Sequence, residues 1–155
     1  MGAVVTNHLQ KLRVGFRNFF PLCKPRVSAM IVFTAVIGMF LATPGFVPLS
    51  ILIPSTIGIF MASGAAAAFN CLIEQEIDAR MARTVNRPLP SGRVSPLETI
   101  FFASIIGIVG LGLLYIYVNP LTMWLTFATF LGYAVIYTIF LKPATPLNIV
   151  IGGAS

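Results

Sequence analysis

The sequence predicts an all-α fold, a multi-pass transmembrane helical bundle with four complete helices and the start of a fifth. Hydrophobic residues make up 57% of the 155 residues and charged residues only 9%, whereas soluble domains carry about a quarter charged residues. The charges are also segregated, because residues 27–73 and 99–141 contain none. One bilayer crossing needs about 20 apolar residues, so each uncharged stretch is long enough for two helices and a turn.

Turn residues divide each uncharged stretch near its middle. Thr-Pro-Gly at 43–45 interrupts the first stretch, and Asn-Pro at 119–120 interrupts the second; proline and glycine commonly mark turns. The predicted helices therefore span residues 27–43, 47–73, 99–118 and 121–141. Pro54 lies within the second helix and predicts a kink or a later start there.

Residues 143–155 form a last uncharged run that is too short for a complete crossing. We expect it to be the beginning of a fifth helix that continues beyond residue 155. On this expectation the chain is the N-terminal part of a longer protein. A re-entrant segment is the alternative.

All ten lysines and arginines fall on one side of the predicted bundle. They lie in residues 1–26, in the loop 74–98 and at Lys142, whereas the two turns on the other side are uncharged. The positive-inside rule makes the basic segment 1–26 and the loop 74–98 cytoplasmic, and residues 27–155 the transmembrane domain. The net charge of +6 follows from this topology. We therefore expect the lipid bilayer, and no nucleic acid, as the partner of the chain.

Three of the four acidic residues lie close together at the cytoplasmic end of the second predicted helix. Asn70, Glu74 and Asp78 are spaced i, i+4 and i+8, which places them on one helical face, whereas Glu76 points elsewhere. Carboxylates at i and i+4 repel each other, and a Mg²⁺ ion would offset this repulsion because it accepts one or two carboxylates together with phosphate oxygens. The alternative interpretation is a solvated helix end.

The loop that follows contains four arginines: Arg80, Arg83, Arg87 and Arg93. Arginine binds phosphate through two parallel hydrogen bonds, so a carboxylate face beside this loop suits a metal-bound diphosphate. Membrane topology alone also explains positive charge here. Both interpretations can hold for the same residues.

Residues 70–93 resemble the first signature of the intramembrane prenyltransferases of the UbiA superfamily, Asn-x3-Asp-x3-Asp. Three further segments resemble the protoheme IX farnesyltransferase (heme O synthase) family within it. They are Leu-Cys-Lys-Pro-Arg-Val at 22–27, Arg-Thr-Val-Asn-Arg-Pro-Leu at 83–89, and Tyr137-Thr138 with Leu141-Lys142 followed by Asn-Ile-Val-Ile-Gly-Gly at 148–153. The resemblance covers the chain from about residue 20 to its end.

The resemblance implies a Mg²⁺-dependent membrane enzyme that transfers a farnesyl group from farnesyl diphosphate to a vinyl group of heme b. Asn70, Glu74 and Asp78 would then be the catalytic residues that hold the metal. The residues that would bind the diphosphate are Arg83, Arg87, Tyr137 and Lys142. The implied location is the bacterial inner membrane, and the implied partners include heme A synthase or terminal oxidase assembly factors.

The sequence departs from the family pattern at two positions and in extent. Glu74 stands where the superfamily has Asp, a change that preserves charge and ligand type, and Pro143 stands where an Arg is usual, which places the role of Lys142 in doubt. Family members also have a second half with its own acidic motif. We therefore expect residues 1–155 alone to be inactive.

Several assignments remain open at the level of sequence. Lys24 and Arg26 are expected to be cytoplasmic anchors or, alternatively, contacts to substrate anions. The wall of small residues in the second helix suits either a farnesyl chain or close helix packing. Alternative functions are another UbiA-type enzyme acting on an aromatic acceptor, or a non-enzymatic transport or assembly subunit.

Overall fold

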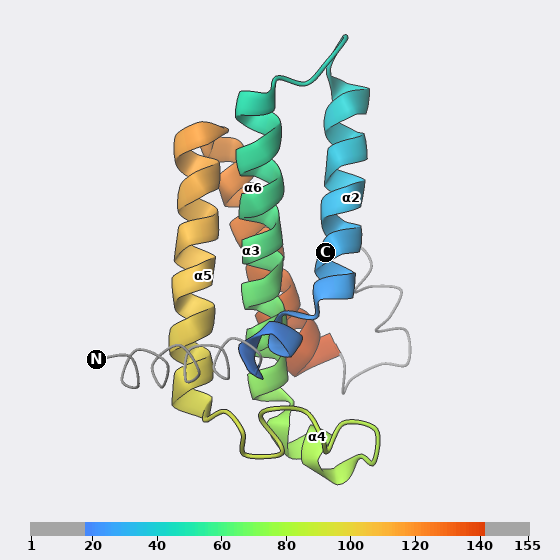
Figure 1. The fold of residues 1–155 in the computed structure, drawn as a ribbon, viewed down its shortest axis with the longest axis vertical. Helices are drawn as coiled ribbons and strands as arrows, with labels where there is room; N and C mark the ends of the chain where they lie inside the picture. The colour runs from blue at the N-terminus through green and yellow to red at the C-terminus, as the bar shows by residue number, and fades with distance from the viewer. Residues whose placement is uncertain (1–17, 142–155) are drawn as a thin grey trace, which may run out of the picture.

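The computed structural model of the chain describes residues 18–141, and for residues 139–141 only the backbone (Figure 1). Every regular element in this range is helical. The elements in chain order are η1 (Phe20–Cys23), α2 (Pro25–Ala42), α3 (Leu49–Ile73), α4 (Gln75–Arg80), α5 (Pro96–Tyr117), α6 (Pro120–Leu131) and a π-helical segment, η2 (Gly132–Leu141).

Four long helical rods run up and down the bundle: α2, α3, α5, and α6 continued by η2 (Figure 1). Each rod is long and apolar enough to cross a membrane. The structure therefore confirms the predicted all-α, multi-pass bundle. The expected start of a fifth helix at 143–155 lies outside the described residues.

The start of one helix and the loop that precedes it differ from the prediction. Helix α5 begins at Pro96, before the predicted residue 99, because Ser95 and Glu98 form a capping box. The Ser95 hydroxyl accepts from the Glu98 backbone N–H at 3.2 Å, and the Glu98 carboxylate accepts from the Ser95 N–H at 2.8 Å. The predicted loop 74–98 is consequently shorter, and it also contains helix α4.

Helix α3 lies at the centre of the bundle and packs most extensively against α5. Glycines permit this close approach. A Cβ atom on Gly110 would lie 2.8 Å from the Gly58 carbonyl oxygen, and one on Gly58 would lie 2.9 Å from the Gly110 carbonyl oxygen. Close packing of small residues is the usual way in which membrane helices associate. The interpretation of the small-residue wall as a packing surface therefore holds for the α5 side of α3.

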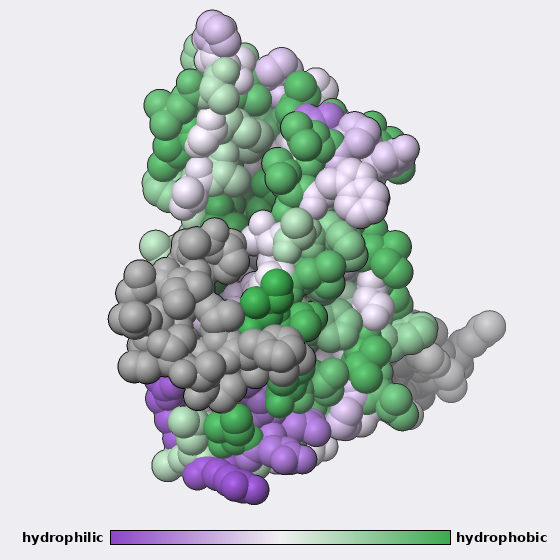
Figure 2. Space-filling model, turned by 180° about the vertical axis from the view of Figure 1, so that it is seen from behind, coloured by the Kyte–Doolittle hydropathy of each residue, from purple (hydrophilic) through white to green (hydrophobic). Residues whose placement is uncertain are grey.

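A hydrophobic cluster closes the end of the bundle at which α4 lies. Helix η1, α3, α5 and the loop after α4 contribute its members, which are Leu22, Ala68, Cys71, Leu89, Val94 and Ala103. Figure 2 shows hydrophobic residues over much of the flank of the bundle and hydrophilic residues gathered at this end. The cluster fixes η1 and the loop against α3, where the polar residues of the candidate site meet.

Candidate functional site

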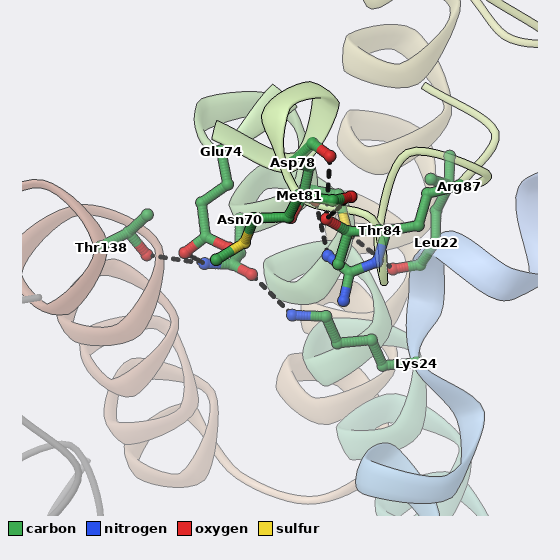
Figure 3. A network of polar contacts seen from close by, with 10 residues as sticks. Leu22, Lys24, Asn70, Glu74, Asp78, Met81, Thr84, Arg87 and Thr138 are labelled. Carbon is green, nitrogen blue, oxygen red and sulfur yellow. Dashed lines mark hydrogen bonds and ion pairs between the residues drawn. The ribbon is translucent and has the colours of Figure 1, made fainter. Parts of the chain in front are cut away.

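Asn70, Glu74 and Asp78 lie on one buried face at the end of α3 and the start of α4 (Figure 3). Their exposed fractions are 2%, 7% and 4%. Glu74 joins the two helices, and helical hydrogen bonds continue through it, from Glu74 N–H to Asn70 O at 3.0 Å and from Asp78 N–H to Glu74 O at 2.8 Å. This continuity keeps the i, i+4, i+8 face intact, whereas Glu76 is exposed.

The Asn70 amide is the centre of a hydrogen-bond network (Figure 3). Its oxygen accepts from the Lys24 ammonium at 2.6 Å. Its nitrogen donates to Glu74 Oε1 at 2.9 Å and to Thr138 Oγ1 at 3.1 Å. Thr138 in turn donates to the Tyr133 carbonyl at 2.9 Å. One amide therefore joins the start of α2, the end of α3 and the π-helical segment η2.

Asp78 is paired with an arginine from the loop that follows it. Arg87 contacts Asp78 Oδ2 at 2.5 Å, and the Arg87 side chain is 34% exposed. The hydroxyl of Thr84 donates to the Asp78 backbone carbonyl at 2.8 Å and folds the loop back over α4. Asp78 thus has a cationic partner and Glu74 accepts from the Asn70 amide, and these interactions reduce the cost of burying the two charges.

The other predicted diphosphate residues are less tightly placed. Arg83 is exposed and makes no hydrogen bond or ion pair with another described residue. Tyr137 is half-buried, and its ring stacks on that of Tyr133 with centroids 5.5 Å apart. Lys142 lies outside the described residues. The structure therefore places Arg87 against Asp78 and leaves Arg83 exposed to solvent.

Sequence reasoning missed two members of the network. Lys24 was expected to be an anchor or a contact to substrate anions, yet its ammonium binds the Asn70 amide, 46 positions away in the sequence. Thr138 was given no role of its own. A hydroxyl within an apolar helix was the signal available for Thr138, because such a group needs a partner away from water.

A cavity of about 310 Å³ lies between α2, α3 and α6 and begins beside this network. Lys24 and Tyr133 line it at the network end. The other lining residues are mostly apolar or small and include Ile31, Ile59, Ala66, Leu125 and Phe130. Its volume lies within the range of small-ligand sites, roughly 300–1,000 Å³. The cavity therefore suits an extended apolar chain whose charged end meets the Asn70 network.

The donor atoms of the site fit a hard divalent cation. Asn70 supplies an amide oxygen, and Glu74 and Asp78 supply carboxylate oxygens, the ligands that Mg²⁺ prefers. No group of three or more His, Cys, Asp or Glu side chains suited to a metal occurs in residues 18–141. A Mg²⁺ ion bound by these residues would complete its coordination with water and phosphate oxygens, as it commonly does.

The family model and the similar curated proteins both indicate prenyltransferases. A family model described as the UbiA prenyltransferase family matches residues 31–155. A protoheme IX farnesyltransferase of Nitrosomonas eutropha is 60% identical over 146 residues, which cover 94% of this chain and 49% of the relative. The protoheme IX farnesyltransferase of Nitrosospira multiformis is 63% identical over 139 residues, or 90% of this chain and 47% of the relative.

The chain spans about half the length of the curated relatives it matches. No solved structure matches it.

Proposed function

Because the chain belongs to the UbiA prenyltransferase family, we propose that it supplies the first carboxylate site of a Mg²⁺-dependent protoheme IX farnesyltransferase. This enzyme type transfers a farnesyl group from farnesyl diphosphate to a vinyl group of heme b and so forms heme O. The curated relatives of the chain are named for this activity. A second half like that of the curated relatives would supply the remaining ligands.

The observation that carries this proposal is the buried face formed by Asn70, Glu74 and Asp78, which Lys24 connects to an apolar cavity. Lys24, at the network end of the cavity, contacts the Asn70 oxygen, and the rest of the cavity lies between three helices and is lined mostly by apolar or small residues. A prenyl diphosphate has the same division, with a charged head and a hydrocarbon tail. The site and the substrate are therefore complementary in charge and in polarity.

The metal ligands in this proposal are the Asn70 amide oxygen and the Glu74 and Asp78 carboxylates. The bound Mg²⁺ would offset negative charge on the diphosphate as it departs. Arg87 lies beside Asp78, and a guanidinium can bind phosphate through two parallel hydrogen bonds. Arg83, Tyr137 and Lys142 complete the proposed diphosphate contacts.

The apolar cavity wall has a separate part in the reaction. The farnesyl C1–O bond breaks with its electron pair on the diphosphate, and the vinyl π electrons of heme form the new C–C bond. Water then adds to the cation left on the porphyrin side and loses a proton, which gives the hydroxyl group of heme O. Side chains that exclude water until the C–C bond has formed protect the farnesyl cation from hydrolysis.

The position of the site in the membrane follows from the same proposal. The basic ends of the helices and α4 face the cytoplasm, in a bacterial inner membrane. Residues 1–155 alone have one of the two carboxylate sites of the family. We therefore expect membranes that contain only these residues to form no heme O, and detectable heme O would contradict this expectation.

The test is heme O formation from farnesyl diphosphate and heme b by membranes that contain the intact protein. Glu74→Gln and Asp78→Asn should each reduce the rate by roughly 100-fold or more, because each replaces a negatively charged metal ligand with a weaker, neutral one. Glu76→Gln is the matched control, since Glu76 is exposed between them, and it should retain the rate. Unchanged activity in Glu74→Gln and Asp78→Asn would remove these residues from the site, and a preference for 4-hydroxybenzoate over heme b would identify a different acceptor.

A further inference from the structure

Lys24 has an unusual backbone conformation for its residue type. Its φ and ψ are 46° and 60°, in the left-handed helical region, and it is the only non-glycine residue with positive φ in the described range. This conformation costs free energy for a residue with a side chain, and glycine avoids that cost. Strain of this kind persists where the surrounding structure fixes it and is often found at functional sites.

The junction between η1 and α2 holds Lys24 in place from both sides. The Lys24 N–H donates to the Pro21 carbonyl at 3.2 Å, and its own carbonyl accepts from the N–H of Ser28 at 3.1 Å. The Ser28 hydroxyl, which is buried, donates to the Cys23 carbonyl at 3.0 Å. The left-handed turn therefore directs the Lys24 side chain toward the end of α3.

The Lys24 ammonium determines which way the Asn70 amide faces. An ammonium group can only donate, so the contact at 2.6 Å requires the amide oxygen on the Lys24 side. The amide nitrogen then faces two acceptors, Glu74 and Thr138. Lys24 also lines the cavity, so its side chain connects the cavity lining to the Asn70 oxygen. The ammonium thus contacts the amide oxygen that the proposed function assigns to the metal.

We propose that Lys24 is a positioning residue whose ammonium takes the place of the divalent cation at the Asn70 oxygen in the substrate-free protein. The inference rests on the proposed function. A positive charge at this position orients the ligand oxygen, and the amide that it orients donates to the buried Glu74 carboxylate. The positive charge also opposes a second cation at the same oxygen, because like charges at this separation repel strongly in a buried site. Metal and diphosphate together displace the ammonium, so the metal binds weakly until the diphosphate arrives.

The test is a titration of the substrate-free, intact protein in detergent with Mn²⁺ as the probe for Mg²⁺. Lys24→Gly removes the ammonium and suits the left-handed backbone. It should bind Mn²⁺ about tenfold more tightly than wild type, because it lacks the competing charge. Lys24→Arg keeps a cation at this position and should keep the wild-type affinity. Lys24→Asn, whose residue type also tolerates this backbone, should behave as Lys24→Gly does.

The controls separate this inference from the proposed function. Arg26→Gln removes a positive charge from an exposed position two residues away and should leave Mn²⁺ affinity unchanged. Equal or weaker Mn²⁺ binding by Lys24→Gly and Lys24→Asn would overturn the inference alone, since a merely structural Lys24 predicts that result. If Glu74→Gln bound Mn²⁺ as tightly as wild type, the metal site itself, and with it both proposals, would be wrong.

Discussion

At the scale of single residues, each buried carboxylate of the candidate site has a nearby hydrogen-bond or ion-pair partner. Burial of a carboxylate is costly unless a cation or a hydrogen bond compensates it. Asp78 has Arg87 as its partner, and Glu74 accepts from an Asn70 amide that is itself bound to Lys24. The same contacts fix the positions of Lys24 and Arg87 in the site.

Arg87→Gln should destabilise the protein because it leaves the buried Asp78 carboxylate without its ion pair. We expect a loss of about 1–3 kcal/mol, moderated by the partial exposure of Arg87. Thermal unfolding of the purified protein in detergent measures this loss. Arg80→Gln, at an exposed position of α4, is the control with little expected effect. Equal melting temperatures for the two variants would show that the ion pair does not contribute to stability.

At the scale of elements, close packing of α3 against α5 aligns the whole site. The end of α3 positions Asn70, and the start of α5 follows the loop that supplies Arg87. Lipid provides little hydrophobic driving force between helices, so van der Waals contact between closely approaching backbones has to stabilise the pair. Glycine at the crossing is therefore a requirement of the fold.

Gly110→Ala should separate α3 from α5, because the added Cβ would lie 2.8 Å from the Gly58 carbonyl oxygen and 3.0 Å from the Ala62 nitrogen. Backbone atoms cannot move aside, and overpacking of this kind costs about 1–3 kcal/mol. Gly112→Ala is the matched control on the same helix, since a Cβ there meets nothing within 4 Å. The melting temperature in detergent should fall for Gly110→Ala only, and a similar fall in both variants would contradict the crossing geometry.

At the scale of the whole molecule, the bundle has a polar end and an uncharged end. Helix α4 and the described basic residues lie at the polar end, and the turn that contains Phe46 lies at the other (Figure 1). This distribution supports a single orientation in the membrane. It also places the Asn70 network toward the polar end of the bundle.

Cysteine labelling in intact cells tests this orientation. A membrane-impermeant maleimide should label Phe46→Cys, at a position that is 92% exposed, and should label Asn86→Cys only after the cells are opened. The native cysteines should give little background, because both are buried, and burial raises the pKa of the Cys23 thiol to about 11. A raised pKa keeps the thiol protonated at neutral pH, and the thiolate is the reactive form. Labelling of Asn86→Cys in intact cells would show that the protein has the opposite orientation in the membrane.

The cavity between α2, α3 and α6 gives a further test at this scale. Ala66→Leu should fill part of the cavity and raise the KM for farnesyl diphosphate by roughly tenfold, because lost apolar contact weakens binding. The shorter geranyl diphosphate should fit the reduced cavity of Ala66→Leu better, so its KM should rise less than that of farnesyl diphosphate. Ala128→Leu, at an exposed position of α6, adds the same volume outside the cavity and should leave the KM unchanged. An unchanged KM in Ala66→Leu would show that the prenyl chain does not bind in this cavity.

Sequence alone determined the membrane fold and the position of the buried acidic face. Uncharged stretches of twice the length of a crossing have few structural solutions in lipid. The i, i+4, i+8 spacing of Asn70, Glu74 and Asp78 follows from helical geometry, which is local in the chain. Local rules also explain the early start of α5, although the Ser95 capping box was overlooked.

Only the tertiary structure decided which partners these residues have. The Lys24–Asn70 and Thr138–Asn70 contacts join positions 46 and 68 residues apart, and no local pattern encodes such separations. The strained backbone at Lys24 and the cavity between three helices depend on how the helices pack. Periodicity places a side chain on a face, but the packing of whole helices decides what that face meets.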